Sequence, residues 1–172
     1  MSTFAENLKR RLFWLIARTC FALYRTFPIF GSLRASIGII RKGANLLVIR
    51  RNDGRGLSLP GGIAGWQESE ESTLRREVQE ETGLHVTSLE LKTRYHSRSD
   101  VPCFISVFEV NASGELQDSW EGSACWMTIE ELEPQLLVSQ RPALEYMKNI
   151  RGGSEVASDG NSGWIRSRKP LS

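Results

Sequence analysis

Three glutamates at helical spacing, Glu77, Glu80 and Glu81, are the side chains of this 172-residue chain that point most directly to chemistry. Residues three and four positions apart are neighbours on a helix surface, so the three carboxylates converge. Like charges placed in this way destabilise a helix by roughly 0.2–0.5 kcal/mol per pair. A hard divalent cation with oxygen ligands offsets that repulsion. The spacing therefore predicts a Mg²⁺ site for phosphate chemistry, with Mn²⁺ as the alternative cation.

The flanking residues favour this metal site over an exposed helix face of surface ion pairs, which is the other common source of such a pattern. Pro60-Gly61-Gly62 is a turn signal, and adjacent glycines let the backbone approach a ligand or expose a carbonyl. Ser69 is the expected N-cap of the helix and Gly83 its left-handed C-cap. The carboxylates are therefore expected in the last half of a helix of about three to four turns.

The same segment resembles the signature of the MutT/Nudix hydrolase family, a spaced set of glycines, glutamates, one arginine and aliphatic residues. Every fixed position of that signature is filled, in order by Gly62, Glu68, Arg76, Glu77, Val78, Glu80, Glu81, Gly83 and Leu84. Leu57 stands where the family often has Trp, and Thr73 where it often has Ala. The resemblance covers about residues 33–150. It implies an α/β fold of the Nudix type, an α/β/α sandwich with a mixed β-sheet.

The resemblance also implies an activity and a set of metal ligands. The activity is Mg²⁺-dependent hydrolysis of a diphosphate bond in a nucleoside di- or triphosphate derivative. The ligands are the carboxylates of Glu77, Glu80 and Glu81, with the carbonyl of Gly61 as a fourth. Arg76 is implied to orient Glu77, which its planar guanidinium can do by binding a carboxylate in one orientation.

The general base has two candidates at this stage. Glu77 is one, because it would lie beside a metal-polarised water. Glu121 is the other, because Glu121-Gly122 resembles the later loop that supplies a base or a further metal ligand in this family. An ordinary exposed loop acid is an equally good explanation of Glu121.

Substrate phosphates require cations, and two basic groups are candidates. Arg94 and His96 alternate along an expected strand, and side chains two apart in a strand share a face. Arg50 and Arg51 end the strand that leads to the glycine turn, and at most one of them can point inward. Arg94, His96 and Arg50 are the predicted substrate-binding residues, although a solvated strand edge explains the first two equally well.

Composition restricts the class of protein. The length fits one domain with a core of its own. Three widely spaced cysteines indicate neither a disulfide framework nor a zinc site, so a reducing, cytoplasmic location is expected. The net charge is +2, but residues 1–30 carry +4 and residues 151–172 carry +2, which leaves −4 for the middle. An acidic centre favours a metal-dependent enzyme with a small nucleotide substrate over a duplex nucleic-acid binder.

Two terminal segments flank the expected domain at 32–150. Residues 1–31 predict a basic amphipathic helix, because apolar residues recur at helical spacing between 4 and 27 with a basic residue every seventh position. Such a helix fits packing on the domain, a homodimer contact or a peripheral membrane contact. Residues 151–172 are rich in Gly, Ser and charge, and are expected to be mostly disordered.

Between the termini, the pattern predicts a mixed sheet covered by helices. Expected strands lie at 34–41, 45–51, 85–95, 102–110 and 124–127, the first two forming a hairpin. A capping-box start follows at Thr128, and a closing helix is expected at 141–150. Two other functions remain open. One is a non-catalytic Nudix-fold module that senses a nucleotide, and the other is a diphosphatase that works at a membrane surface.

Overall fold

The computed structural model describes residues 19, 33–99, 101–151 and 164–165. The predicted N-terminal helix lies outside these residues. Within the described part, no helix is long and apolar enough to cross a membrane. The main elements are β1 (Leu33–Lys42), β2 (Asn45–Arg51), β3 (Leu57–Ser58), β4 (Gly61–Ile63), α2 (Glu70–Thr82), β5 (His85–Ser97), β6 (Cys103–Ser113), β7 (Gly122–Met127), α3 (Ile129–Leu132), α4 (Arg141–Arg151) and β8 (Trp164–Ile165).

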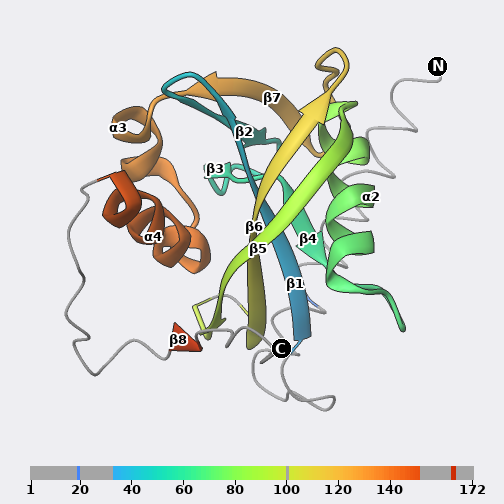
Figure 1. Ribbon diagram of the computed structural model, residues 1–172, viewed down its shortest axis with the longest axis vertical. Coiled ribbons are helices and arrows are strands. Elements are labelled where there is room, and N and C mark those ends of the chain that lie inside the picture. Colours follow the sequence, from blue (N-terminus) through green and yellow to red (C-terminus); the bar gives the residue numbers. More distant parts are fainter. Residues whose placement is uncertain (1–18, 20–32, 100, 152–163, 166–172) are drawn as a thin grey trace, which may run out of the picture.

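These elements form three layers, with the sheet in the middle, α2 on one face, and α3 and α4 on the other (Figure 1). The strand order is β3-β2-β1-β6-β5-β8, with β4 paired to β1 and β7 paired to β2. The β1–β6 pair is parallel, and the other strand pairs are antiparallel. The predicted α/β/α sandwich with a mixed sheet is confirmed.

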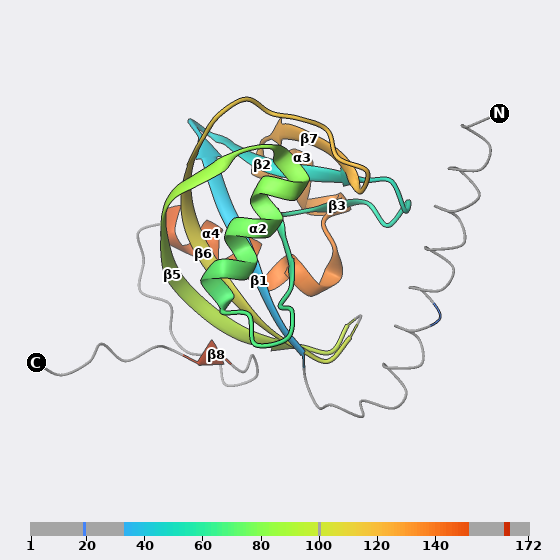
Figure 2. The ribbon, with the colours of Figure 1, turned by 90° about the vertical axis from the view of Figure 1, so that its right-hand side faces the viewer.

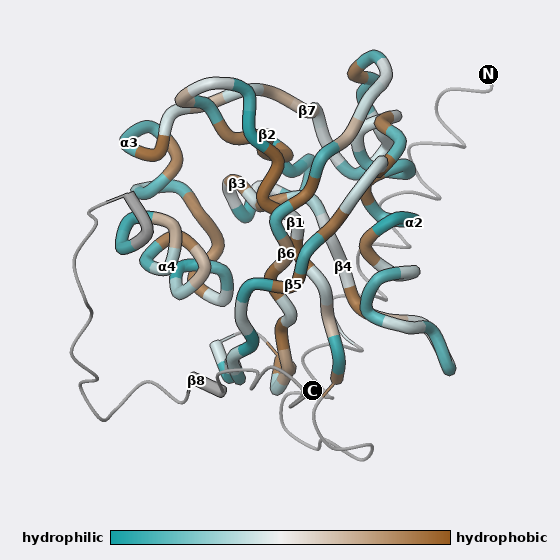
Figure 3. Tube along the Cα trace, in the orientation of Figure 1, coloured by the Kyte–Doolittle hydropathy of each residue, from teal (hydrophilic) through white to brown (hydrophobic). Residues whose placement is uncertain are grey.

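Strand β1 is buried on both faces because a helix layer covers each side. Ile37 and Ile39 pack into the cluster shared with α4, whereas Ile40 packs into the cluster shared with α2. Its near-continuous apolar run is typical of a strand covered on both faces. Figure 3 shows the same arrangement, since hydrophobic colour concentrates on the central strands between the helix layers.

Helix α2 carries the glutamates and lies across the sheet face, as Figure 2 shows from the front. Its N-cap is Ser69, whose side chain accepts from the Ser72 N–H over 3.1 Å. Its C-cap is Gly83, which has φ +74 and donates to the Gln79 carbonyl over 3.0 Å. Both predicted caps are confirmed. Val78 on its inner face is fully buried, so the helix orientation is set by apolar contact.

The strands predicted from the sequence all form, with ends that differ by a few residues. The hairpin of β1 and β2 pairs Lys42 with Asn45, and Thr128 makes the expected capping box. Three short strands were missed. One is β3, which pairs with β2. The expected glycine turn is itself the strand β4, and β8 in the tail pairs with β5 through Arg94↔Ile165 and Tyr95↔Trp164. The rest of the tail lies outside the described residues.

Candidate active site

Two glycines in β4 bring the backbone close to both the sheet and α2. Gly61 has φ +140, and a Cβ there would overlap the Ser36 carbonyl oxygen. Gly62 pairs with Ser36, and a Cβ there would overlap Oε1 of Glu77. Glycine is therefore required at both positions. At Gly61 the reason is the backbone conformation, and at Gly62 the reason is that a side chain would have no room. The result is a bare stretch of backbone facing the carboxylates of α2.

The three glutamates of α2 differ in burial. Glu81 is 2% exposed, and its Oε2 accepts from the Gly61 N–H over 2.8 Å. Burial raises the pKa of Glu81 to about 8, with nearby Glu77 and Glu121 adding to the rise. Burial also raises the pKa of Glu77. Glu80 is the outermost, with its side chain 58% exposed. Two of the three acids, Glu77 and Glu81, therefore lie where water is largely excluded, and burial disfavours their charged form.

Arg76 links these carboxylates to the loop before α2. Its Nη1 donates to Oε1 of Glu77 at 2.9 Å and to Oε2 of Glu80 at 3.1 Å. Its Nε and Nη2 hold both oxygens of Glu68, which lowers the pKa of Glu68 to about 2. Oε2 of Glu68 also accepts from the Gly65 N–H at 2.8 Å. Arg76 therefore contacts Glu77 as the resemblance implied, and Glu68 anchors the loop to the helix.

The loop before β7 brings Glu121 to the same place from a distant part of the chain. Its carbonyl accepts from the Asn52 N–H at 2.8 Å, and its own N–H donates to Oγ of Ser119 at 3.2 Å. Gly122 permits this approach, because a Cβ there would overlap the Arg50 carbonyl oxygen. Burial raises the pKa of Glu121, with Glu80 among the negative charges that add to it. Glu121 is therefore a half-buried acid beside the cluster, not an ordinary exposed loop acid.

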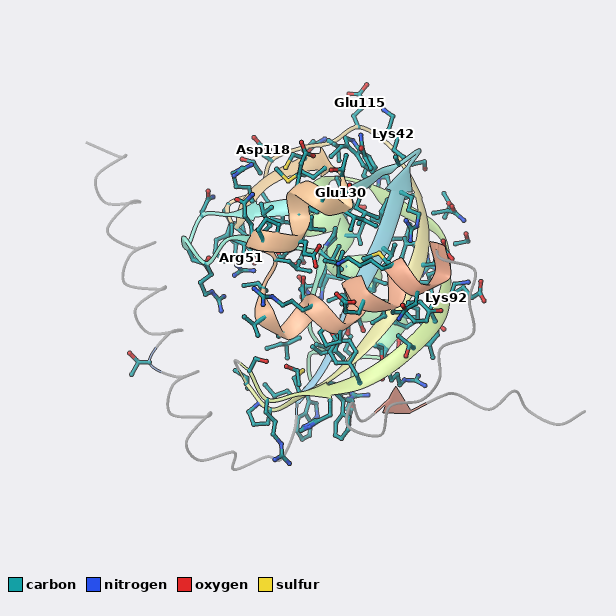
Figure 4. All side chains as sticks on the ribbon, turned by 90° about the vertical axis from the view of Figure 1, so that its left-hand side faces the viewer. Lys42, Arg51, Lys92, Glu115, Asp118 and Glu130 are labelled. Atoms are coloured by element: carbon teal, nitrogen blue, oxygen red, sulfur yellow. The ribbon has the colours of Figure 1, made fainter. Side chains whose placement is uncertain are left out.

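Arg51, and not the predicted Arg50, points toward the carboxylates. Side chains alternate along β2, so Arg51 shares the α2 face with Leu47 and Ile49, while Arg50 lies on the other face and is exposed. Against the effect of burial, Asp53 raises the pKa of Arg51, and the charges of Glu81 and Glu121 add to the rise. Asp53 fixes its guanidinium through Nε and Nη2, the latter at 2.8 Å. Figure 4 shows Arg51 at the opposite side of the molecule from Lys92.

The row of Arg94 and His96 lies away from the glycines and the carboxylates of α2. Arg94 pairs with Ser106, Ser106 with Ser36, and Ser36 with Gly62, so three strand spacings, about 14 Å, separate Arg94 from the glycines. The Arg94 guanidinium binds Glu70 at 2.7 Å, at the opposite end of α2 from Glu81. The His96 ring packs against Phe104 at 4.7 Å between centroids. Sequence alternation identified their common face but not its distance from the cluster.

The donor set fits a hard divalent cation. Glu77, Glu80 and Glu81 offer carboxylate oxygens, which Mg²⁺ prefers, and burial raises the pKa of Glu77 and of Glu81, with neighbouring carboxylates adding to the rise. Within the described residues, each of these carboxylates keeps one oxygen outside any hydrogen bond. Arg76 and the Gly61 N–H occupy the other oxygens, and the same residues contain no group of three acidic, Cys or His side chains already gathered around one point. The cluster is thus a set of suitable ligands held by internal partners.

Comparison with known proteins agrees with the box, the layers and the strand order. The NUDIX domain family model matches residues 32–147. A MutT-like protein from Streptomyces ambofaciens is 32% identical over 113 residues, which span 64% of this chain and 73% of that protein.

Two solved structures share the fold. The E. coli ORF135 protein has a TM-score of 0.61 at 22% identity, covering 73% of this chain and 94% of that one. A MutT NUDIX hydrolase from Burkholderia pseudomallei has a TM-score of 0.58 at 22% identity, and the match covers 66% of this chain and 96% of that one. The family match spans most of the described domain and includes every residue of the glycine–glutamate box. The chain therefore belongs to the Nudix hydrolase family.

Proposed function

We propose that this Nudix hydrolase is a Mg²⁺-dependent pyrophosphohydrolase that cleaves a diphosphate bond in a nucleoside di- or triphosphate derivative. The observation that carries the proposal is that the carboxylates of α2 lie against the backbone of β4, where Gly61 and Gly62 carry no side chains. Glu81 is buried on the Gly61 amide, and Oε1 of Glu77 occupies the space that a Gly62 side chain would fill. Desolvated acids of this kind are costly to maintain, and a cation that binds phosphate offsets the cost.

Glu77, Glu80 and Glu81 would hold the cation, with the Gly61 carbonyl as a further oxygen donor. A bound Mg²⁺ neutralises charge on phosphate oxygens and lowers the pKa of water. Arg76 restrains Glu77 and Glu80 in fixed orientations through its two short contacts. Preorganised charges of this kind stabilise a transition state because they need no rearrangement during the reaction.

Glu121 is the better candidate for the general base. No described residue hydrogen-bonds its carboxylate, whereas Arg76 already binds the Glu77 carboxylate. Burial raises the pKa of Glu121, and a base works best when its pKa is near the operating pH. Its carboxylate would accept the proton of the attacking water. The backbone contacts to Asn52 and Ser119 would keep it oriented.

Arg51 replaces Arg50 as the proposed phosphate-binding cation. Its side chain is 12% exposed, and Asp53 holds it on two nitrogens, so little conformational freedom is lost when it binds a ligand. A guanidinium also matches the geometry of a phosphate. Arg94 and His96 would then act only on a distant part of a large substrate.

A substrate panel with product identification tests the proposal. Purified protein is incubated with Mg²⁺ and nucleoside triphosphates, nucleoside diphosphate derivatives and dinucleotides, in water enriched in ¹⁸O to identify the attacked phosphorus. At least one compound should be consumed, and the double variant Glu80→Gln, Glu81→Gln should abolish turnover. Glu71→Gln is the matched control, since Glu71 is an exposed glutamate in the first turn of the same helix. Nucleotide binding without turnover would favour the sensing module instead.

Cytoplasmic location, and a membrane or dimer contact of the N-terminal segment, remain predictions from composition. Flotation with anionic liposomes, with and without residues 1–31, tests the membrane contact. Recovery of both proteins in the unbound fraction would exclude it.

A further inference from the structure

A buried serine in β3 lacks a hydrogen-bond partner. Ser58 is 2% exposed, and no described residue bonds its Oγ. Other buried hydroxyls are satisfied, since Ser36 Oγ donates to the Glu70 carbonyl at 2.8 Å and Thr82 Oγ1 to the Val78 carbonyl at 2.6 Å. A buried hydroxyl without a partner destabilises the folded state relative to alanine. A partner for this hydroxyl therefore has to come from outside the described residues, as the oxygen of a water or of a ligand.

The direction of the Ser58 side chain follows from its neighbours. Leu57 and Leu59 belong to the cluster on the α4 side, so the residue between them points to the α2 side. Ser58 pairs with Ile49 across the sheet, and Arg51 lies two residues after Ile49 on the same face. Ser58 therefore shares its face with the arginine that points toward the carboxylates.

Two groups close to Ser58 in the chain or in the sheet interact with Glu81. The Gly61 amide, three residues after Ser58, donates to Oε2 of Glu81. Arg51 lies on β2, the strand that pairs with β3, and its charge interacts with that of Glu81. The hydroxyl of Ser58 lies on the sheet face that it shares with Arg51. Within the described residues, Oε1 of Glu81 has no hydrogen bond either.

We propose that Ser58 is a positioning residue of the carboxylate site. Its hydroxyl donates to an oxygen that enters beside Glu81 when the site is loaded, either a water or a phosphate oxygen. A serine hydroxyl suits this task because it rotates freely and can both donate and accept. The phosphate alternative rests on the proposed function, whereas the water alternative does not. The unsatisfied hydroxyl lowers the stability of the cation-free protein, and this loss is the cost of having the donor in place.

Thermal unfolding of Ser58→Ala tests the proposal, in EDTA, in Mg²⁺, and in Mg²⁺ with inorganic phosphate. In EDTA the variant should unfold about 2–4 °C above the native protein, because alanine removes an unsatisfied polar group. The Tm rise caused by the added ligand should fall to less than half its native size. A reduction already present with Mg²⁺ alone identifies the acceptor as water, and one that needs phosphate identifies a phosphate oxygen. With any substrate that the native protein turns over, the kcat of Ser58→Ala should be about tenfold lower than that of the native protein.

Ser106→Ala is the matched control, because Ser106 is equally buried but its hydroxyl is used by Arg94 Nε at 3.2 Å. It should lower the Tm in EDTA and leave the ligand-induced rise unchanged. Ser58→Thr keeps the hydroxyl and should restore the ligand response.

The proposal is wrong if Ser58→Ala lowers the Tm in EDTA as Ser106→Ala does, or if its ligand-induced rise and its turnover match those of the native protein. A native protein that turns over no nucleotide would refute the proposed function instead. The loss of Mg²⁺ response in Ser58→Ala would still support the role of Ser58.

Discussion

The Gly61 amide donates to Oε2 of Glu81 over 2.8 Å, which joins the strand before α2 to the last turn of that helix. The bond depends on the backbone at Gly61, whose φ of +140 is rarely adopted by other residues. It satisfies one oxygen of a buried carboxylate and leaves the other available. The glycines and the glutamates of the box therefore form one structural unit, and changes to either should affect both.

Gly62→Ala should abolish most of the activity and leave the fold intact. The new Cβ would overlap Oε1 of Glu77, which must then move away from the site. Turnover is expected to fall by about 100-fold or more, equivalent to roughly 2.7 kcal/mol of transition-state stabilisation. Gly43→Ala is the control, since a Cβ at Gly43 meets nothing within 4 Å and the strain there comes only from its φ of +61. That variant should lose some stability and keep its turnover.

Glu81→Gln should stabilise the cation-free protein at pH 8. Burial raises the folded pKa of Glu81 from 4.5 to about 8, so the folded state binds more protons than the unfolded state across that interval. The free energy of unfolding of the native protein therefore falls as pH rises from about 5 to 8. The glutamine cannot ionise and can still accept from Gly61. Its Tm should exceed the native value by at least about 3 °C at pH 8, with little difference at pH 5.

Thermal unfolding in EDTA at both pH values provides the measurement for Glu81→Gln, and its activity should be lost at the same time. An equal Tm for the two proteins at pH 8 would mean that Glu81 is already ionised at no cost in the folded state.

Arg76→Lys should impair turnover because lysine cannot replace the guanidinium fork. Arg76 reaches Glu68, Glu77 and Glu80 with three different nitrogens. A single ammonium can satisfy only part of this set. We expect kcat to fall at least tenfold in steady-state assays. Arg75→Lys is the neighbouring control, because Arg75 is exposed and donates to the Val86 carbonyl outside the cluster. Equal kcat values for the two variants would refute an orienting role for Arg76.

Arg51→Ala and Arg50→Ala should separate the two arginines of β2. Arg51 faces Glu81 and Glu121, whereas Arg50 is exposed on the other face. We expect KM to rise at least tenfold for Arg51→Ala and to stay within twofold of native for Arg50→Ala. Loss of Arg51 should also lower the Tm, because Asp53 has its side chain only 10% exposed and loses one of its two arginine partners. The reverse order of KM values would restore Arg50 as the phosphate ligand.

Local spacing in the sequence was sufficient to predict helix α2, its caps and its converging glutamates. Ser69 and Gly83 act on backbone groups within four residues, and Glu77 meets Arg76 on one helix. Such contacts follow from helix geometry alone. The hairpin of β1 and β2 was predictable for the same reason, since its two strands are joined by a short turn.

Longer contacts were predicted less well. Alternation along β2 indicated that one of two arginines points inward, but the choice of Arg51 depends on which sheet face α2 covers. Alternation predicted that Arg94 and His96 share a strand face, but it could not give their distance from Gly62, because strand pairing puts three strand spacings between Arg94 and Gly62. Ser58 carried no signal at all in the sequence.

The sequence by itself therefore determined the chemistry of this protein, through residue types at fixed spacing on one helix. Only the tertiary structure decided which distant residues join that chemistry. It brought Arg51 and Glu121 to the carboxylates, placed Arg50 and Arg94 away from them, and put Ser58 on the same sheet face as Arg51. The physical reason is that helix geometry relates residues within a few positions, whereas sheet pairing and layer packing relate residues whose separation along the chain has no fixed value.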